Sequence, residues 1–343
     1  MKILVTGGAG FLGSHVCDYY RKKNWEVVAY DNLTKYELNR TGYNADSARN
    51  YNIGFLKNAG VTLLKADIRD SQALLNATKG CDYIVHTAAQ PAMTIGLENP
   101  DLDFSTNVIG TYNVLSTARA LNIPVANCCT IHVYGNGIND HLTEEETRYA
   151  LSPSAIDENY PILSGKITPL HASKICGEHY TRMFIDSYGL KAASFRLTGL
   201  YGERQFGGED HGWVANFTIR TIMGRPITLF NTGKQVRDIL HAQDLCACFH
   251  AFFTQQVPGI YTVGGGEEHA ISLLETIEYL NKLNGGQSSP IVAGGERFGD
   301  LNYFVSNIRK VQENLQWKPC IHPQKGIAYL YNWVKENQNL FCC

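Results

Sequence analysis

A glycine-rich segment near the amino terminus constrains the fold more than any other part of the chain. The sequence T-G-G-A-G-F-L-G occupies residues 6–13, directly after the apolar run at residues 2–6 and before a helical pattern. Glycines at this spacing let the backbone turn tightly and approach a pyrophosphate, whose charge the start of the following helix favours. The segment therefore predicts a dinucleotide site of the strand–turn–helix type, centred on Gly7, Gly10 and Gly13.

Short apolar runs alternate with helical patterns through the first two hundred residues. Continuous apolar runs are typical of parallel strands that are covered on both faces, and repeated strand–helix units imply a doubly wound α/β sheet of the Rossmann type. The predicted strands are 2–6, 26–31, 61–68, 82–89, 124–130 and 192–200, and the predicted helices include 106–121 and 173–188.

Glycines break the chain into shorter pieces after Tyr201, which predicts a smaller carboxy-terminal lobe. The long apolar stretch that follows residue 238 is expected to return to the sheet. We therefore assign 1–200 and 236–263 to the dinucleotide-binding domain, and 201–235 and 264–343 to a lobe that binds the substrate.

Composition excludes several classes of function. The net charge of −2 offers no basic face for nucleic acid, and no apolar run reaches the ~18 residues that a membrane helix needs. The ten cysteines include no C-x-x-C pair, which argues against a zinc site, and no other feature supports dependence on a metal. A reduced, cytoplasmic protein is the simplest interpretation.

Two acidic residues follow predicted strands and suggest how a dinucleotide would be held. The run E-V-V-A-Y-D ends at Asp31, the acidic residue expected about 20 positions after the glycine turn to bind ribose hydroxyls. A carboxylate there repels a 2′-phosphate, so NAD is favoured over NADP. Asp67, in A-D-I, could accept a hydrogen bond from the adenine amino group, although capping of a loop explains it equally well.

Motifs along nearly the whole chain identify a family. They include H-T-A-A-Q at 86–90, N-V-I-G-T-Y-N-V-L at 107–115, V-Y-G at 133–135 and R-L-T-G-L-Y-G at 196–202. With the glycine turn, they resemble the extended short-chain dehydrogenase/reductase family of nucleotide-sugar epimerases and dehydratases. The resemblance implies NAD as cofactor, a nucleotide-diphosphate sugar as substrate, and a homodimer formed through helices 106–121 and 173–188.

The resemblance also implies site residues. Arginine suits bidentate contact with phosphate, although a surface ion pair is the alternative for either arginine alone. Residues 204–217 and 233–238 resemble the CDP-sugar epimerases of the family, so a CDP-sugar is favoured. The expected cofactor-binding residues are Gly7, Gly10, Phe11, Leu12, Gly13, Asp31, Asn32, Asp67, Ile68, Ala88, Ala89 and Lys174, and the expected substrate-binding residues are Gln90, Thr130, Thr198, Arg237 and Arg297.

One family element is missing. The family carries Y-x-x-x-K, in which the tyrosine takes a hydroxyl proton, but residues 168–174 read T-P-L-H-A-S-K and place Leu170 four residues before Lys174. Thr130 retains the family's hydroxyl, which is too weak a base at neutral pH. Because general acid–base catalysis contributes ~10²–10⁴ in rate, loss of the phenol requires a replacement.

Several side chains are candidates for that replacement. His171 is our first choice because it lies three residues before Lys174 and imidazole titrates near neutral pH. His132 and Cys128 share a strand face with Thr130, and Lys174 itself could act if its pKa were lowered. Tyr160 could fold back from the preceding loop. For each histidine, a satisfied position in the core is the plainer alternative.

Two functions remain open at this point. The first is an enzyme that oxidises a sugar carbinol to a ketone and then reduces it again, with epimerisation favoured and a simple oxidoreductase as a variant. The Asp-Glu pair that dehydratases carry beside Thr130 is absent, which disfavours 4,6-dehydration. The second is an inactive or regulatory relative that binds NAD and a nucleotide sugar without turnover.

Overall fold

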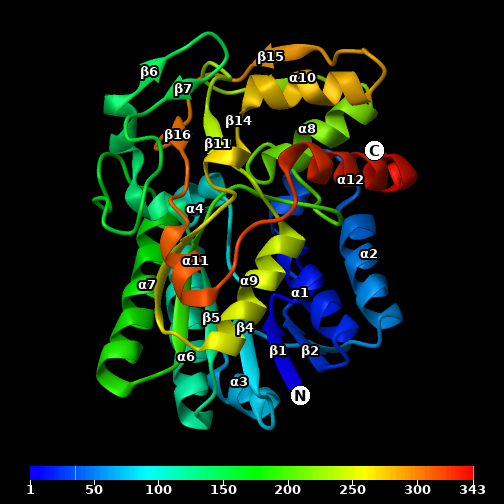
Figure 1. Ribbon diagram of the computed structural model, residues 1–343. Coiled ribbons are helices and arrows are strands. Elements are labelled where there is room, and N and C mark those ends of the chain that lie inside the picture. The colour runs from blue at the N-terminus through cyan, green and yellow to red at the C-terminus, as the bar shows by residue number, and fades with distance from the viewer. Residues whose placement is uncertain (35, 343) are drawn as a thin grey trace.

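A seven-stranded parallel sheet forms the centre of the computed structural model, which describes residues 1–34 and 36–342 (Figure 1). Its strand order is β13-β8-β5-β4-β1-β2-β3, and every neighbouring pair is parallel. The first two strands have the predicted bounds, and the next four are shorter than predicted. The strands are β1 (Lys2–Thr6), β2 (Glu26–Asp31), β3 (Thr62–Lys65), β4 (Tyr83–His86), β5 (Val125–Thr130), β8 (Ala192–Leu197) and β13 (Gly259–Val263).

Helices cover both faces of this sheet, which confirms the predicted doubly wound α/β fold. Alternation along β1 sends Ile3 and Val5 into one apolar cluster and Leu4 into another. The first cluster is closed by α1 (Phe11–Lys22), α9 (Ala242–Gln255) and α11 (Arg309–Leu315), and the second by α3 (Ser71–Thr78), α6 (Gly110–Leu121) and α7 (Pro169–Tyr188).

Two predicted helices differ from expectation at their starts. Before α6, a π-helical segment, Phe104–Ile109, replaces the start of the predicted helix. The helix predicted from residue 173 begins four residues earlier, at Pro169, because Thr168 caps it. The hydroxyl of Thr168 accepts a hydrogen bond from the His171 N–H, and Nδ1 of His171 accepts one from the Thr168 N–H. Threonine followed by proline is a start signal for a helix.

A second layer lies above the carboxyl ends of the strands (Figure 1). Three helices, α8 (Trp213–Ile222), α10 (Leu273–Leu283) and α12 (Pro323–Glu336), share one apolar cluster there. The accompanying strands are β10 (Ile227–Leu229), which pairs with β15 (Ile291–Ala293), and β11 (Val236–Asp238), which lies between β14 (Ala270–Ser272) and β16 (Tyr303–Phe304). The remaining helices and strands are α2 (Ala45–Asn58), α4 (Met93–Glu98), α5 (Pro100–Asp103), β6 (Thr143–Glu144), β7 (Tyr149–Ala150), β9 (Leu200–Tyr201) and β12 (Leu240–His241).

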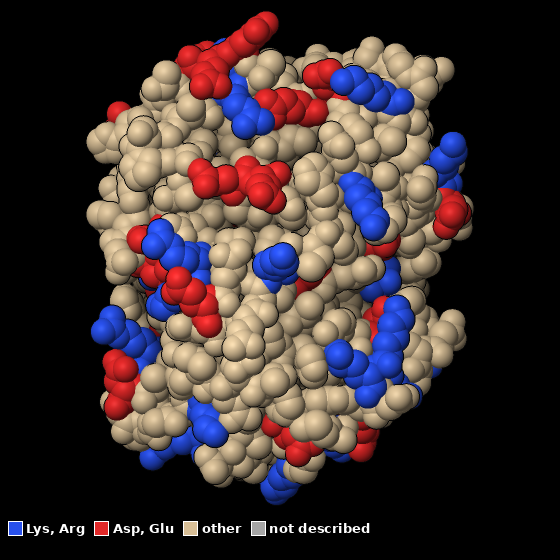
Figure 2. Space-filling view, viewed as in Figure 1, with Lys and Arg blue, Asp and Glu red and all other residues tan. Residues whose placement is uncertain are grey.

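The stretch after β11 returns to the sheet, since it forms β12, α9 and β13, and β13 pairs with β8 at the sheet edge. The division into two domains remains a prediction. Acidic and basic side chains are intermingled on the face shown in Figure 2. None of the helices in residues 1–34 and 36–342 is long and apolar enough to cross a membrane.

Candidate active site

A cavity of about 510 Å³ opens at the carboxyl ends of β1 and β4. These neighbouring strands mark the point where the strand order reverses, because the chain proceeds from β1 to β2 and β3 on one side and from β4 to β5, β8 and β13 on the other. Ligands of doubly wound folds bind in the crevice at this point. Residues of the second layer, among them Arg237 and Arg297, close the cavity from the opposite side.

The glycine turn leaves room for a ligand only because it lacks side chains. Gly7 has a φ of +68°, and its carbonyl accepts a hydrogen bond of 2.9 Å from the Gly10 N–H. A Cβ on Gly13 would lie 2.1 Å from the Gly7 oxygen, so any side chain there would displace the backbone. Gly10 begins α1 without a side-chain cap, which leaves the N–H groups of the first turn available to an anion.

Two carboxylates are fixed at the far end of the cavity. Asp31 accepts hydrogen bonds from the backbone N–H groups of Ala9 (2.9 Å) and Leu33 (2.7 Å). Asp67 pairs with Arg69 at 2.7 Å and accepts a hydrogen bond from Asn32. The Arg69 guanidinium holds the pKa of Asp67 at about 2, so this carboxylate is charged at neutral pH. Both acceptors are therefore oriented before any ligand arrives.

Cationic side chains surround the middle of the cavity. Lys174 donates a hydrogen bond of 3.0 Å to the Cys128 carbonyl, and burial lowers the pKa of its ammonium. Arg237 lies 3.6 Å from Asp300, and Arg297 lies over the Phe230 ring with its guanidinium carbon 3.6 Å from the ring centre. Asp300 lies near both guanidinium groups, and Asp210 and Glu209 lie near that of Arg297. The planar fork of each arginine still suits bidentate contact with a diphosphate.

Arg204 is a cavity residue that sequence reasoning missed. Its guanidinium is buried, lies over the Phe55 ring, and donates to the Ser14 hydroxyl at 3.1 Å, while Nη2 has no hydrogen-bond partner. Its backbone has a φ of +63°, which is unusual for a residue other than glycine. Ser14 is 190 positions away in the sequence, so no local pattern could indicate this contact.

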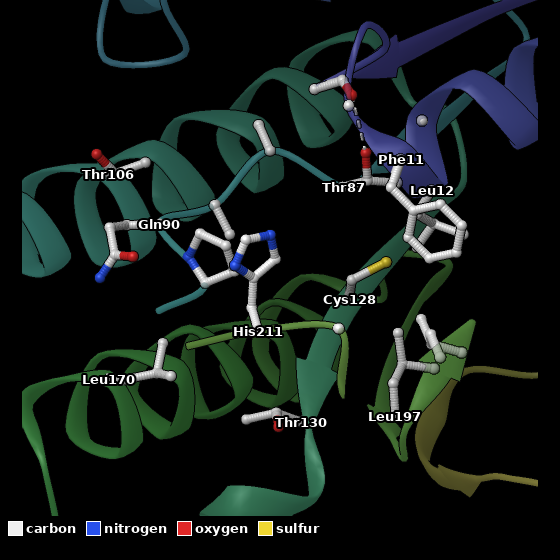
Figure 3. A pocket seen from close by; sticks show the side chains of 18 of the residues that line it. Phe11, Leu12, Thr87, Gln90, Thr106, Cys128, Thr130, Leu170, Leu197 and His211 are labelled. Carbon is white, nitrogen blue, oxygen red and sulfur yellow. Dashed lines mark hydrogen bonds between the residues drawn. The ribbon is translucent and has the colours of Figure 1, made fainter. Parts of the chain in front are cut away.

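The opposite end of the cavity contains Leu170, Thr130 and His211. Figure 3 shows Leu170 on α7, Thr130 at the end of β5, and the His211 ring above them around the same space. Sequence reasoning assigned no role to His211, because its loop approaches the cavity from the second layer, where Arg220 and Thr228 hold the neighbouring Glu209. Cys128 also lines this space, but burial raises the pKa of its thiol to about 12.

The structure does not bring His171 to the cavity wall. Its side chain is fully buried, and its Nδ1 is occupied by the helix cap. Residues four apart share a helix face, so Leu170 and Lys174 both line the cavity, whereas each single step turns the helix by about 100° and directs His171 elsewhere. His132 lines the wall instead, and its ring stacks on that of His171 with centroids 5.2 Å apart.

Two further predicted residues have other partners. Tyr160, one candidate for the missing base, packs against Tyr134 and is not part of the cavity wall. Gln90 lines the cavity, but its amide donates to the Ala92 carbonyl and to Asp103 and accepts from the Ala92 N–H. The side-chain amide of Gln90 therefore bonds to other residues of the wall. Both of its N–H groups are already used, so they are not free for the predicted contact with the substrate.

The cavity brings together all the predicted site residues except His171, although their roles remain predictions. Among residues 1–34 and 36–342, no cluster of histidine, cysteine, aspartate or glutamate is arranged to hold a metal ion. The residues on the wall are Gly7, Gly10, Phe11, Leu12, Gly13, Asp31, Asn32, Asp67, Ile68, Ala88, Ala89, Gln90, Thr130, Lys174, Thr198, Arg237 and Arg297.

Comparison with known proteins agrees with this geometry. Residues 3–264 match the NAD dependent epimerase/dehydratase family. The chain belongs to this family. The CDP-paratose 2-epimerase of Salmonella typhi is 30% identical over 97% of this chain and 99% of its own length. A putative UDP-glucose 4-epimerase of Methanocaldococcus jannaschii is also 30% identical, over 98% and 99% of the two chains.

Solved structures of epimerases share the fold over almost the full length. The UDP-glucose 4-epimerase of Thermus thermophilus, in complex with NAD, has a TM-score of 0.77 and 29% identity, covering 97% of this chain and 98% of that one. The UDP-glucuronic acid 4-epimerase of Bacillus cereus has a TM-score of 0.82 at 23% identity, covering 98% and 100%. The second likeness shows the fold alone.

NAD is the cofactor of this epimerase/dehydratase family member. The cavity fits it on grounds of its own. The uncapped start of α1 and the cradle that a Cβ on Gly13 would fill suit a pyrophosphate, and the fixed carboxylate of Asp31 suits ribose hydroxyls. The same carboxylate would repel the additional phosphate of NADP.

Proposed function

We propose that this protein is an NAD-dependent nucleotide-sugar epimerase. The observation that carries the proposal is that one cavity joins a dinucleotide turn to two arginines, Arg237 and Arg297, from the second layer. A dinucleotide alone would need only the first half. The additional cations suit the diphosphate of a second ligand, whose sugar would then lie between Thr130 and Leu170.

The cavity residues divide into three proposed roles. Bound NAD supplies an acceptor and donor of hydride. Lys174 binds the nicotinamide ribose, and Arg204, whose Nη2 has no partner, binds the pyrophosphate opposite the start of α1. Arg237 and Arg297 bind the diphosphate of the substrate, while the hydroxyl of Thr130 holds a sugar oxygen. Thr198 is less suited to direct contact, because its hydroxyl donates to Asp238 at 2.8 Å.

A CDP-sugar is the proposed substrate, and epimerisation at C2 is the proposed outcome. Support comes from the likeness to a CDP-paratose 2-epimerase over almost the whole chain and from the similar segment at residues 204–217. That segment supplies Arg204, Glu209 and His211 to the cavity wall. The likeness to UDP-glucose 4-epimerases makes UDP-sugars the first alternative substrates to test.

We also propose a homodimer formed through α6 and α7. Large apolar side chains are exposed along these helices and the π-helical turn before them. Tyr112 and Tyr180 are 42% and 40% exposed although their rings lie 5.4 Å apart, and Phe104 is 58% exposed. Burial of this surface against a second copy would remove it from water. The cytoplasmic location remains a prediction.

Proton NMR of the purified protein in D₂O tests the activity. The protein would be incubated with NAD and, in turn, with CDP-, UDP-, GDP- and dTDP-sugars. A new sugar signal without deuterium at carbon is expected, because the hydride that leaves the sugar returns to it. Deuterium at carbon would indicate enolisation or elimination instead.

A second function is favoured by one observation, the buried Leu170 beside Lys174. A relative that binds NAD and a nucleotide sugar without turnover would need no proton acceptor. Calorimetric binding of both ligands, with no change in any sugar of the panel, would favour this binding protein over the epimerase.

A further inference from the structure

An epimerase built on this cavity must move a proton without a phenol at position 170. Oxidation of a carbinol removes a hydride from carbon and a proton from oxygen, and the proton needs an acceptor within reach. Leucine offers none. The end of the cavity around Leu170 contains Thr130, His132, Lys174 and His211, together with Cys128, whose thiol pKa is raised to about 12 by burial.

His132 lies beside Thr130, the residue proposed to hold the sugar. His132 lies two residues after the end of β5, and its backbone N–H donates to the Thr130 hydroxyl at 3.3 Å. Both residues line the cavity, as Leu170 does. A sugar hydroxyl held by Thr130 would therefore lie on the same part of the wall as His132.

The His132 ring is held in place from behind. It stacks on the His171 ring with an interplanar angle of 10° and a centroid separation of 5.2 Å. His171 is immobilised in turn, because both its backbone N–H and its Nδ1 take part in the cap of α7. Nδ1 of His132 is buried without a hydrogen-bond partner, which leaves Nε2 as the nitrogen that can face the ligand.

The surroundings keep this imidazole neutral. Burial, followed by the proximity of His171 and Arg237, holds the pKa of His132 well below its ordinary value. A neutral ring has a lone pair at physiological pH and can accept a proton, whereas an imidazolium could not. The same lowering makes the imidazole a weaker base than one with a pKa near ~7, so the support for His132 comes from its position on the wall. Burial also lowers the pKa of His171, to about 4, so the stacked pair carries no charge at rest.

We propose that Nε2 of His132 accepts the hydroxyl proton of the sugar and later returns it, in place of the tyrosine, and that His171 positions the ring. The inference rests on the proposed epimerase function. In the oxidative step the O–H bond of the sugar breaks and an N–H bond forms on His132, while the carbinol C–H electrons leave as hydride to NAD and a ketone remains. In the reductive step the hydride returns to the opposite face of the ketone carbon, the N–H bond on His132 breaks, and its proton returns to the ketone oxygen.

The other candidates are less suited to this task. Lys174 already donates to the Cys128 carbonyl, and a lysine must first lose a proton to act as a base. Thr130 has a hydroxyl of high pKa. His211 also points into the cavity, but it is supplied by a loop between Gly208 and Gly212 rather than by the end of a strand (Figure 3). His211 is the alternative that the experiments must separate from His132.

Chemical modification tests the position of His132 without any substrate. Diethyl pyrocarbonate acylates accessible neutral imidazoles, and peptide mass spectrometry locates the product among the 11 histidines. We expect brief treatment of the NAD-bound protein at pH 6.5 to modify His132 and the exposed His141, but to spare the fully buried His171. An unmodified His132 beside a modified His211 would overturn the assignment.

Variants then test the proton transfer with the sugar that the NMR panel identifies. We expect His132→Gln to lower kcat by about 10²–10⁴-fold while the Kd for NAD changes less than twofold. Added imidazole should restore at least about tenfold of the rate to His132→Gly, which a structural role would not allow. His141→Gln, at an exposed position outside α6 and α7 and away from the cavity wall, is the matched control and should keep the full rate.

The outcomes separate the two proposals. Retention of kcat within threefold in His132→Gln, or absence of imidazole rescue in a folded His132→Gly, contradicts the role of His132 and leaves the epimerase proposal intact. Absence of turnover by the unchanged protein with every sugar contradicts the epimerase function, whereas the modification experiment still reports whether His132 faces the cavity.

Discussion

The cavity has a half that we assign to the dinucleotide and a half that we assign to the reacting sugar, and the two differ in the groups that line them. In the dinucleotide half, we expect backbone N–H groups of the glycine turn and of the start of α1 to bind the cofactor. Few residues other than glycine can occupy this turn. In the reacting half, side chains from β5, α7 and the loop before α8 meet around one space. We infer from this difference that the proton acceptor of such a cavity can change more readily than the turn that we assign to the cofactor.

Steric room differs in the same way. A Cβ on Gly7, Gly8 or Gly13 would meet backbone atoms within 2.8 Å. Leu170, by contrast, occupies the position at which the predicted family motif has a tyrosine, and it lines the wall beside Lys174. We therefore expect substitutions in the first half to abolish binding, and substitutions in the second half to change the chemistry.

The largest effect is expected for Gly13→Ala. Its methyl group would lie 2.1 Å from the Gly7 oxygen, which is fixed by the hydrogen bond from Gly10. Relief of the clash must open the turn, so we expect the affinity for NAD to fall at least about 10³-fold, or by more than ~4 kcal/mol, as measured by calorimetry.

Gly54→Ala is the control for that variant. Gly54 lies within α2, and a Cβ there would meet nothing within 4 Å. Alanine in a helix interior is favoured over glycine by about 0.5–1 kcal/mol, so thermal unfolding should shift slightly upward and the affinity for NAD should be unchanged. Normal NAD affinity in Gly13→Ala would mean that the turn does not form the cofactor site.

A tyrosine at position 170 would give the reacting half a second group able to take up a proton. Leu170 and Lys174 line the same cavity, so Leu170→Tyr would place a hydroxyl beside the proposed sugar site. In the His132→Gln background we expect this change to restore about 10²-fold in kcat, because either group can serve as acid and base. The measurement is kcat for His132→Gln, for Leu170→Tyr and for the double variant. If the double variant loses as much activity as the two single variants together, the cavity has no room for the tyrosine ring.

Sequence reasoning located the dinucleotide half well because its determinants are local. The turn, α1 and Asp31 lie within about 25 consecutive residues, and each has a recognised spacing. The doubly wound sheet follows from the same regularity, since repeated apolar strands and helices admit few arrangements. Strand ends were placed less well, because the apolar runs continue into the loops that enter the cavity.

The reacting half was located only in part. Helical geometry turns His171 away from Leu170 and Lys174, and three residues of separation do not ensure a shared face. His132 reaches the cavity wall with Thr130 and Cys128, but strand alternation is not the reason, because β5 ends at Thr130 and His132 lies in the 3-10 helix Ile131–Tyr134. His211 and Arg204 were missed since the loop that contains them meets the cavity only after the second layer folds over the sheet.

A smaller effect is expected at Arg204, and it tests whether the dinucleotide half depends on side chains at all. Arg204→Gln would remove a buried charge that we place beside the pyrophosphate, so the affinity for ADP-ribose should fall about 30-fold, or ~2 kcal/mol. The affinity for adenosine, which has no phosphate, should stay within twofold. Equal losses for both ligands in calorimetric titrations would indicate a structural role for the contact with Ser14.

The smallest effect is expected at Asp31, the side chain that accepts a hydrogen bond from the turn at Ala9. Asp31→Asn keeps the size of the residue, but an amide can accept from only one of the two N–H groups, of Ala9 and Leu33, that now bind the carboxylate. Loss of the charge should weaken NAD binding about tenfold, or ~1.4 kcal/mol, and weaken NADP binding less, because repulsion of the 2′-phosphate also disappears. Fluorescence titrations with both dinucleotides would measure the ratio of the two affinities. An unchanged ratio would mean that Asp31 serves the loop that follows β2 and not the ribose, and selection of the cofactor would then rest on the backbone alone.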